Sequence, residues 1–166
     1  MYIFTKKDKK NFNDLKYCLK EFGLPIKAEK KIDAGMIIES EFEHKEHSAR
    51  IFILLNPSCK VVTIILDYGI AEGEKITTLY ELIDRINMKL CTCHFIVCPD
   101  TGHVSLCSGM HLTHDRISKK EFLVILGMLI AESCFFAPLI VQQIESDKKP
   151  EVLWNQFLIE NKDRID

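Results

Sequence analysis

Apolar residues recur every three or four positions in four segments of the chain, and this is the period of an amphipathic α-helix. The predicted helices are 11–22, 73–87, 119–144 and 151–161. Ser118 and Glu121 have the spacing of a capping box at the start of the third helix, and Thr78 and Glu81 have it within the second. Pro138 is expected to bend or end the third helix, because proline removes a helical hydrogen bond.

Alternating or continuous apolar runs predict strands between these helices. The predicted strands are 36–42, 50–55, 60–66, 90–98 and 103–108, and a short edge strand is expected at 26–32. The polar stretch 43–48 is expected to be a turn. The runs 50–55 and 60–66 are rich in Ile, Val and Phe, which indicates central strands covered on both faces.

The order of these elements, α-β-β-β-α-β-β-α-α, separates helices from antiparallel hairpins. This order indicates an α+β fold, with one antiparallel sheet of about five strands (three plus two) and helices packed on it. The chain has 166 residues and shows no internal linker, repeat or low-complexity stretch. We therefore expect a single domain over 1–166.

Composition and charge indicate an ordinary globular domain and argue against a nucleic-acid-binding protein. Hydrophobic residues make up 47% and charged residues 28%, as in ordinary globular domains. The net charge is -2, and the basic cluster Lys6–Lys10 contains Asp8. A nucleic-acid-binding surface is usually strongly basic, so no nucleic acid is expected among the partners.

Seven cysteines are many for this length, and their number is odd. The start, Met1–Lys10, lacks the apolar stretch of a secretory signal. We therefore expect reduced thiols and a cytoplasmic protein rather than a disulfide framework.

Cysteine and histidine are concentrated in 91–114, where a hairpin with the loop 99–102 would pair His94 with Cys107 and Cys98 with His103. Both residue types bind zinc, so His94, Cys98, His103 and Cys107 are candidate ligands. The two pairs lie roughly 13 Å apart at about 3.3 Å per residue, so this hairpin alone cannot supply four ligands to one ion. His111, His114 or a second subunit would have to complete the site. A second alternative is a reactive thiol at Cys98 or Cys107 beside a histidine, but the sequence shows no third group to orient the histidine.

No glycine-rich phosphate loop, serine-centred elbow or pair of catalytic carboxylates occurs in the chain. Asp100-Thr101-Gly102 matches the tripeptide of dimeric aspartic proteases, but a Pro-Asp-x-Gly stretch is also a common hairpin turn. We therefore expect no enzymatic activity and no cofactor.

The predicted helix 119–144 is apolar nearly all round, and a helix packed on a sheet needs only one apolar face. A second subunit or the C-terminal helix must then cover its other face, or the helix must contact a membrane. Glu132 and Pro138 argue against a membrane span, so we expect a homodimer that also binds a client protein. The expected interface residues are Phe122, Ile125, Leu126, Leu129 and Ile130.

Two local features accompany this order of elements: the strand pair formed by His94–Val97 and Gly102–Leu106, and the capped helix that begins at Ser118–Phe122. With them the chain resembles the YbjN family, whose fold is shared with type III secretion chaperones. The resemblance covers a core of 10–145 and leaves a C-terminal helical extension of 146–166. It implies a small, dimer-forming domain that binds or regulates another protein without catalysis, and it carries over no catalytic residues.

Overall fold

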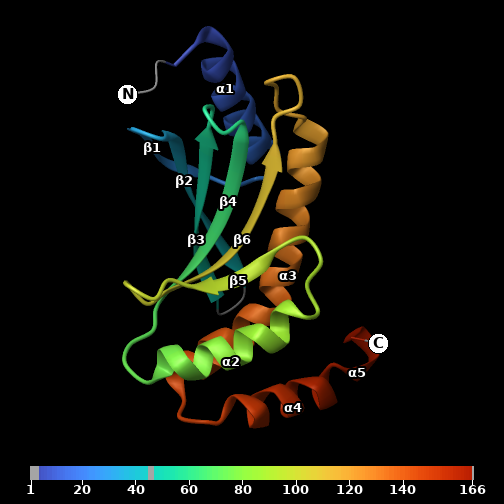
Figure 1. Cartoon of the computed structure of the whole chain (residues 1–166). Helices are drawn as coiled ribbons and strands as arrows, with labels where there is room; N and C mark the ends of the chain where they lie inside the picture. The colour runs from blue at the N-terminus through green and yellow to red at the C-terminus, as the bar shows by residue number, and fades with distance from the viewer. Residues whose placement is uncertain (1–3, 45–46, 166) are drawn as a thin grey trace.

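The computed structural model describes residues 4–44 and 47–165, which form an α+β fold (Figure 1). Its elements are α1 (Lys6–Glu21), β1 (Ile26–Ile32), β2 (Gly35–His44), β3 (His47–Asn56), β4 (Val61–Ile70), α2 (Lys75–Asn87), β5 (His94–Val97), β6 (His103–His111), α3 (Lys119–Glu145), α4 (Pro150–Glu160) and α5 (Lys162–Ile165). The predicted helices and strands are thus confirmed, with shifted ends.

All described strands belong to one antiparallel sheet with the order β1-β2-β3-β4-β6-β5. The sheet has six strands because the short edge strand at 26–32 is present beside β2. The predicted turn at 43–48 is shorter than expected, since β2 continues to His44 and β3 begins at His47. Its centre, 45–46, lies outside the described residues.

The structure confirms one of the two predicted helix caps and contradicts the other. The Ser118 side chain accepts a hydrogen bond from the backbone N–H of Glu121, as the capping sequence predicts. The capping box predicted inside α2 is wrong, because the Thr78 hydroxyl instead donates to the Lys75 carbonyl within the helix. Of the two effects expected of Pro138, ending the helix does not occur, since α3 continues to Glu145 as a helix that contains this proline.

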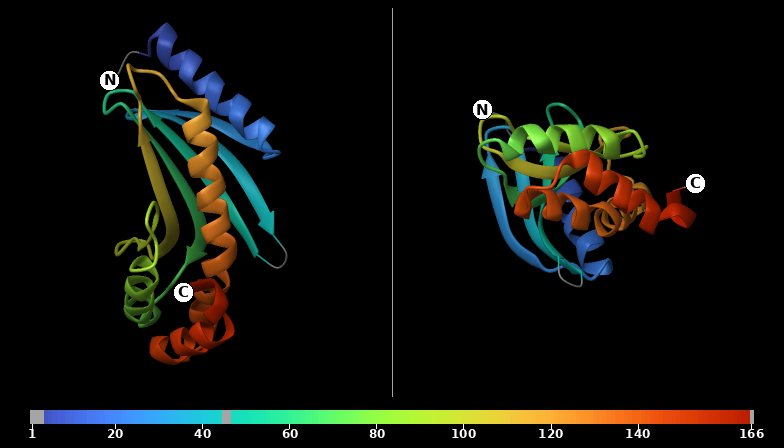
Figure 2. Two further views of the ribbon diagram at one scale, coloured as in Figure 1. Left: turned by 90° about the vertical axis from the view of Figure 1, so that its right-hand side faces the viewer. Right: turned by 90° about the horizontal axis from the view of Figure 1, so that it is seen from below.

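Helices α1 and α3 cover the same face of the sheet, and α2 and α4 lie at one end of it (Figure 2). On the covered face Ile53, Ile64 and Leu106 are completely buried. On the opposite face the neighbouring residues Phe52 and Ile65 are only half-buried. The expectation that the central strands are covered on both faces is therefore wrong for this chain, although the second face also carries apolar side chains.

Candidate functional site

The cysteine- and histidine-rich hairpin has the predicted register. His94 pairs with Cys107, and the Cys98 backbone N–H donates to the His103 carbonyl at 2.8 Å. Phe95 is buried in the core, so alternation places the side chains of the two Cys/His pairs on the other face of the sheet.

The hairpin does not bring the four candidate zinc ligands together. His94 is exposed, whereas Cys107 is 7% exposed and its burial raises the pKa of its thiol to about 11. In the part of the chain that the structure describes, no three His, Cys, Asp or Glu side chains are grouped closely enough to hold a metal ion. The arrangement therefore gives no support to the zinc alternative.

In the structure a carboxylate lies beside one histidine of the hairpin, a contact that the sequence did not reveal. The carboxylate of Asp67 on β4 lies 3.1 Å from Nδ1 of His103, and Arg50 on β3 donates to its other oxygen. The Asp67 side chain is 6% exposed, while that of His103 is 38% exposed. Sequence reasoning missed Asp67 because it lies 36 positions from His103 and is joined to it only by the pairing of β4 with β6.

Cys98 begins the tight turn that joins β5 to β6, where the N–H of Gly102 donates to the Cys98 carbonyl at 2.8 Å. The groups that favour its thiolate form are the Thr101 hydroxyl and the backbone N–H groups of Thr101 and Asp100. These donors stabilise the thiolate and so hold the pKa of the half-buried Cys98 thiol below its usual value.

The other buried thiols are shifted in the opposite direction. Burial raises the pKa of Cys93 to about 12, and it also raises the pKa of Cys18. A buried thiol with a raised pKa is mostly protonated at neutral pH and therefore unreactive. Cys98 is thus chemically distinct from Cys18, Cys93 and Cys107.

The five residues predicted for a partner interface lie mostly in the core of the chain itself. Phe122, Leu126, Leu129 and Ile130 are between 0% and 9% exposed, and only Ile125 is half-buried. These four side chains face the chain's own core, so they cannot form an interface while the chain is folded. The interface prediction is therefore wrong for these four residues, because all-round apolarity could not tell which face of the helix meets the sheet.

The exposed apolar surface of α3 lies on the opposite side of the helix. Val124 and Met128 are 53% and 40% exposed, and Ala131 is also exposed. On the neighbouring α1, Tyr17 is 58% exposed, and Phe22 at its end lies against Gly127. We call this surface, made of Tyr17, Phe22, Val124, Met128 and Ala131, the outer helical patch.

Of the described helices, α3 alone is long and apolar enough to cross a membrane by length and composition. A helix in the core of a soluble protein passes the same test, so this is weak evidence for a membrane role. In this chain α3 packs along the sheet through its buried side.

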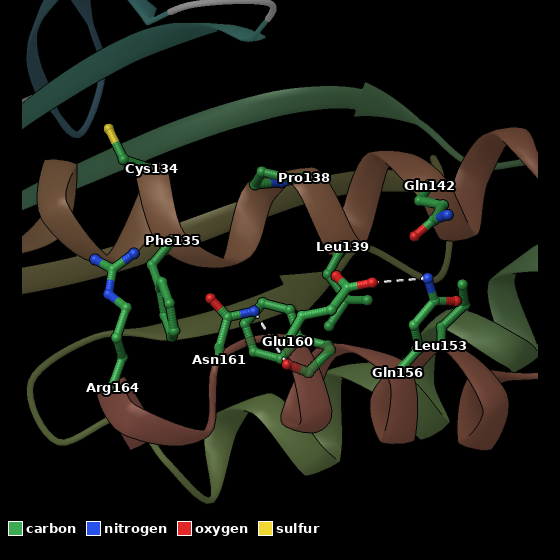
Figure 3. A pocket seen from close by; sticks show the side chains of 11 residues that line it. Cys134, Phe135, Pro138, Leu139, Gln142, Leu153, Gln156, Glu160, Asn161 and Arg164 are labelled. Atoms are coloured by element: carbon green, nitrogen blue, oxygen red, sulfur yellow. Dashed lines mark hydrogen bonds between the residues drawn. The ribbon is translucent and has the colours of Figure 1, made fainter. Parts of the chain in front are cut away.

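A groove of about 460 Å³ lies between α4 and the C-terminal half of α3, which are in contact with each other (Figure 3). Aromatic, aliphatic and polar side chains line it, and the guanidinium of Arg164 lies 4.6 Å from the ring centroid of Phe135. The C-terminal helix therefore covers the end of α3 beyond Cys134, as one alternative from the sequence proposed, and leaves the outer helical patch uncovered.

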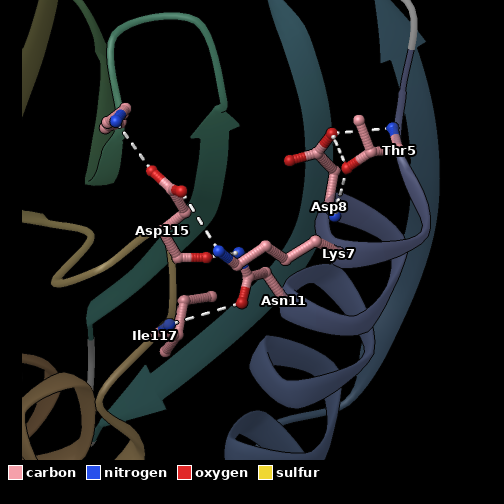
Figure 4. Close-up of polar contacts among 7 residues, drawn as sticks. Thr5, Lys7, Asp8, Asn11, Asp115 and Ile117 are labelled. Carbon is pink, nitrogen blue, oxygen red and sulfur yellow. Dashed lines mark hydrogen bonds and ion pairs between the residues drawn. The ribbon is translucent and has the colours of Figure 1, made fainter.

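Helix α1 is attached to the segment before α3 by a small polar cluster (Figure 4). The amide of Asn11, which is 2% exposed, donates to the Asp115 carbonyl and accepts from the N–H of Ile117. The Asp115 carboxylate pairs with Lys60 and Lys7, and these cations lower its pKa. The cluster fixes α1 beside α3 and so positions the two halves of the outer helical patch.

Comparison with known proteins identifies the fold but no function. No family model and no curated protein matches the chain. Among solved structures, an uncharacterized protein from Methanothermobacter thermautotrophicus is similar with a TM-score of 0.53 at 11% identity, over 81% of this chain and 99% of that one. YbjN from E. coli gives a TM-score of 0.49 at 9% identity, over 81% of this chain and 89% of that one. The first likeness shows a shared fold, and the resemblance to YbjN holds only as a distant likeness of fold.

Proposed function

We propose that this chain is a non-catalytic protein-binding domain that works as a homodimer, with the outer helical patch as its self-association surface. The observation that carries the proposal is the exposure of Tyr17, Val124 and Met128, at 58%, 53% and 40%. Large apolar side chains grouped on one exposed face are typical of an interaction site.

A second copy of the chain fits this patch because the patch contains both large side chains and a small residue that leaves a groove between them. Val124 and Met128 protrude from α3, whereas Ala131, on the same face, ends at its Cβ. Two helices pack when large side chains of one enter the grooves of the other, and a second copy of this patch provides both large side chains and a groove.

The uncovered face of the sheet provides a separate surface for a client protein. It presents apolar, half-buried side chains on adjacent strands, including Phe52 on β3 and Ile65 on β4, which are direct neighbours in the register. Antiparallel sheets with one solvated face usually place polar residues there. None of the seven cysteines forms a disulfide, which fits a cytoplasmic location.

Light scattering coupled to size-exclusion chromatography tests the dimer. The wild-type chain, with a subunit mass of 19.2 kDa, is expected at twice that mass. Met128→Glu should give the mass of one chain, because it places a charge in the patch. The matched control is Ile159→Glu, since Ile159 on α4 is 79% exposed but lies outside the patch; this variant should remain a dimer.

Phe52→Lys separates the two surfaces, since it changes only the open sheet face and should leave the dimer intact. A wild-type protein of single-chain mass at micromolar concentration would refute the dimer. Dissociation by Phe52→Lys but not by Met128→Glu would move the dimer interface to the sheet. Co-sedimentation of a single-chain protein with anionic vesicles would instead support the membrane alternative.

A further inference from the structure

The open sheet face, which is the face that carries Phe52 and Ile65, has an apolar centre on β2, β3 and β4. Phe52 on β3 pairs with Ile65 on β4, and Leu54, two positions further along β3, pairs with Ile37 on β2. All four side chains are half-buried, and the long helices α1 and α3 cover the opposite face (Figure 2). An apolar sheet surface is normally covered by another layer, so this centre is suited to a partner.

Beside this centre the charged side chains have a defined arrangement. Among the described residues, three ion pairs with a lysine or an arginine lie on this face: Lys27–Glu41, Lys30–Glu39 and Arg50–Asp67. The cationic side chains are 55%, 60% and 63% exposed, whereas the carboxylate side chains are 38%, 25% and 6% exposed in the same order. A partner that approaches the face therefore meets the ammonium and guanidinium groups before the carboxylates.

The cations and the apolar centre adjoin each other. The guanidinium of Arg50 lies 5.6 Å from the ring centroid of Phe52. An ammonium has three N–H donors and a guanidinium has five, so one carboxylate does not use them all. A hollow of about 440 Å³ is lined by Lys27, Lys30, Glu39, Ser40, Glu41, Arg50 and Phe52.

We propose that the open sheet face binds an amphipathic helix whose apolar side is flanked by glutamate or aspartate. The inference rests on the proposed function, in which this face is the client surface, and it names the chemical class of the client. A helix about 10 Å wide covers about two strands at a spacing of about 4.8 Å, so it can lie over the apolar centre of β3 and β4. Carboxylates on one flank of the helix then accept hydrogen bonds from Lys27, Lys30 and Arg50.

The same arrangement favours an acidic protein segment over a nucleic acid. A nucleic-acid strand is held mainly by many phosphate contacts with cations, and here Glu39 and Glu41 lie in the same hollow as the cations. A helix can place a carboxylate beside each cation and its apolar side chains over the centre. It therefore uses both parts of the surface at once.

Fluorescence anisotropy of the full chain with two labelled peptides tests the proposal. Each peptide has about 18 residues, or about 27 Å of helix, with the same leucine face and either glutamate or lysine on its flanks. The glutamate peptide should bind at least about ten times more tightly than the lysine peptide at low salt. The difference should shrink as salt is added, because the screening length falls to about 8 Å at physiological ionic strength.

Lysine variants test the role of the cations. Lys27→Gln and Lys30→Gln should each weaken binding of the glutamate peptide about two- to five-fold, because each removes one exposed charge pair. The matched control is Lys60→Gln, since Lys60 is 62% exposed and pairs with Asp115 in the segment before α3. This control should bind the peptide as the wild type does. Phe52→Ser should weaken binding of both peptides, and circular dichroism checks that each variant folds.

The outcomes separate this inference from the proposed function. Equal binding of the two peptides, lost in Phe52→Ser, would overturn the acidic class of the client and leave the client surface in place. Tighter binding of single-stranded DNA than of the glutamate peptide, or equal losses in Lys30→Gln and Lys60→Gln, would also overturn the inference. Failure of both peptides to bind would overturn it together with the client surface, whereas the dimer is decided separately by light scattering.

Discussion

Replacement of Leu126 by alanine tests which side of α3 is built into the chain. Leu126 is completely buried, and it lies in the hydrophobic core with residues of the sheet and of α1. The substitution removes three carbon atoms, which at about 0.8 kcal/mol each is a transfer loss of about 2.4 kcal/mol. The cavity left behind raises the total loss to about 3–4 kcal/mol, as for other buried leucines.

Urea denaturation followed by circular dichroism measures this loss. A domain of this size has a slope of about 2 kcal/mol per molar urea, so the midpoint of Leu126→Ala should fall by about 1.5–2 M. The matched control is Met128→Ala, two positions away on the exposed side at 40% exposure. Its stability should change by no more than about 0.5 kcal/mol when measured on the dissociated chain.

If the other side of α3 faces the core, Met128→Ala and not Leu126→Ala should lower the stability of the chain. A Leu126→Ala protein with unchanged stability but a lost dimer would show that this side of α3 meets a second subunit. A Met128→Ala protein destabilised by about 3 kcal/mol would lead to the same conclusion, because only a core side chain loses that much. Either result would refute the assignment of Leu126 to the chain's own core.

Two further predictions concern the turns that hold the sheet and α1 in place. Gly102→Ala should cost at least about 3 kcal/mol in urea denaturation, because Gly102 has φ +70° and a Cβ there would lie 2.1 Å from the Ala71 carbonyl oxygen. Gly73→Ala, at φ +59° with open space around it, should cost only about 1 kcal/mol. The pKa of Asp115 is lowered in the folded chain by Lys60 and Lys7, so its contribution to stability is present above the usual carboxylate pKa and is lost as the pH falls through the lowered value. Wild type should therefore lose more stability than Asp115→Asn between about pH 5 and pH 2, and equal losses in a urea series over that range would contradict this.

The sequence by itself determined the local structure of this protein. Helical and strand periodicity predicted each main element, because side-chain burial on one face repeats every 3.6 residues in a helix and every two in a strand. The register of the Cys98–His103 hairpin also followed from the sequence, since a loop of four residues fixes which residues face each other. The Ser118 cap was also predictable, because this contact is local: its partner Glu121 is only three positions away.

Only the tertiary structure decided which apolar surfaces are covered and which distant groups meet. The predicted interface residue Leu126 and the exposed Met128 are equally apolar in the sequence, and the packing of α3 on the sheet buries one and leaves the other outside. The pairing of β4 with β6 brings Asp67 to His103, which no local pattern predicts because the contact depends on strand order. The sequence specified the helix and the hairpin, whereas their roles depend on contacts between segments far apart in the chain.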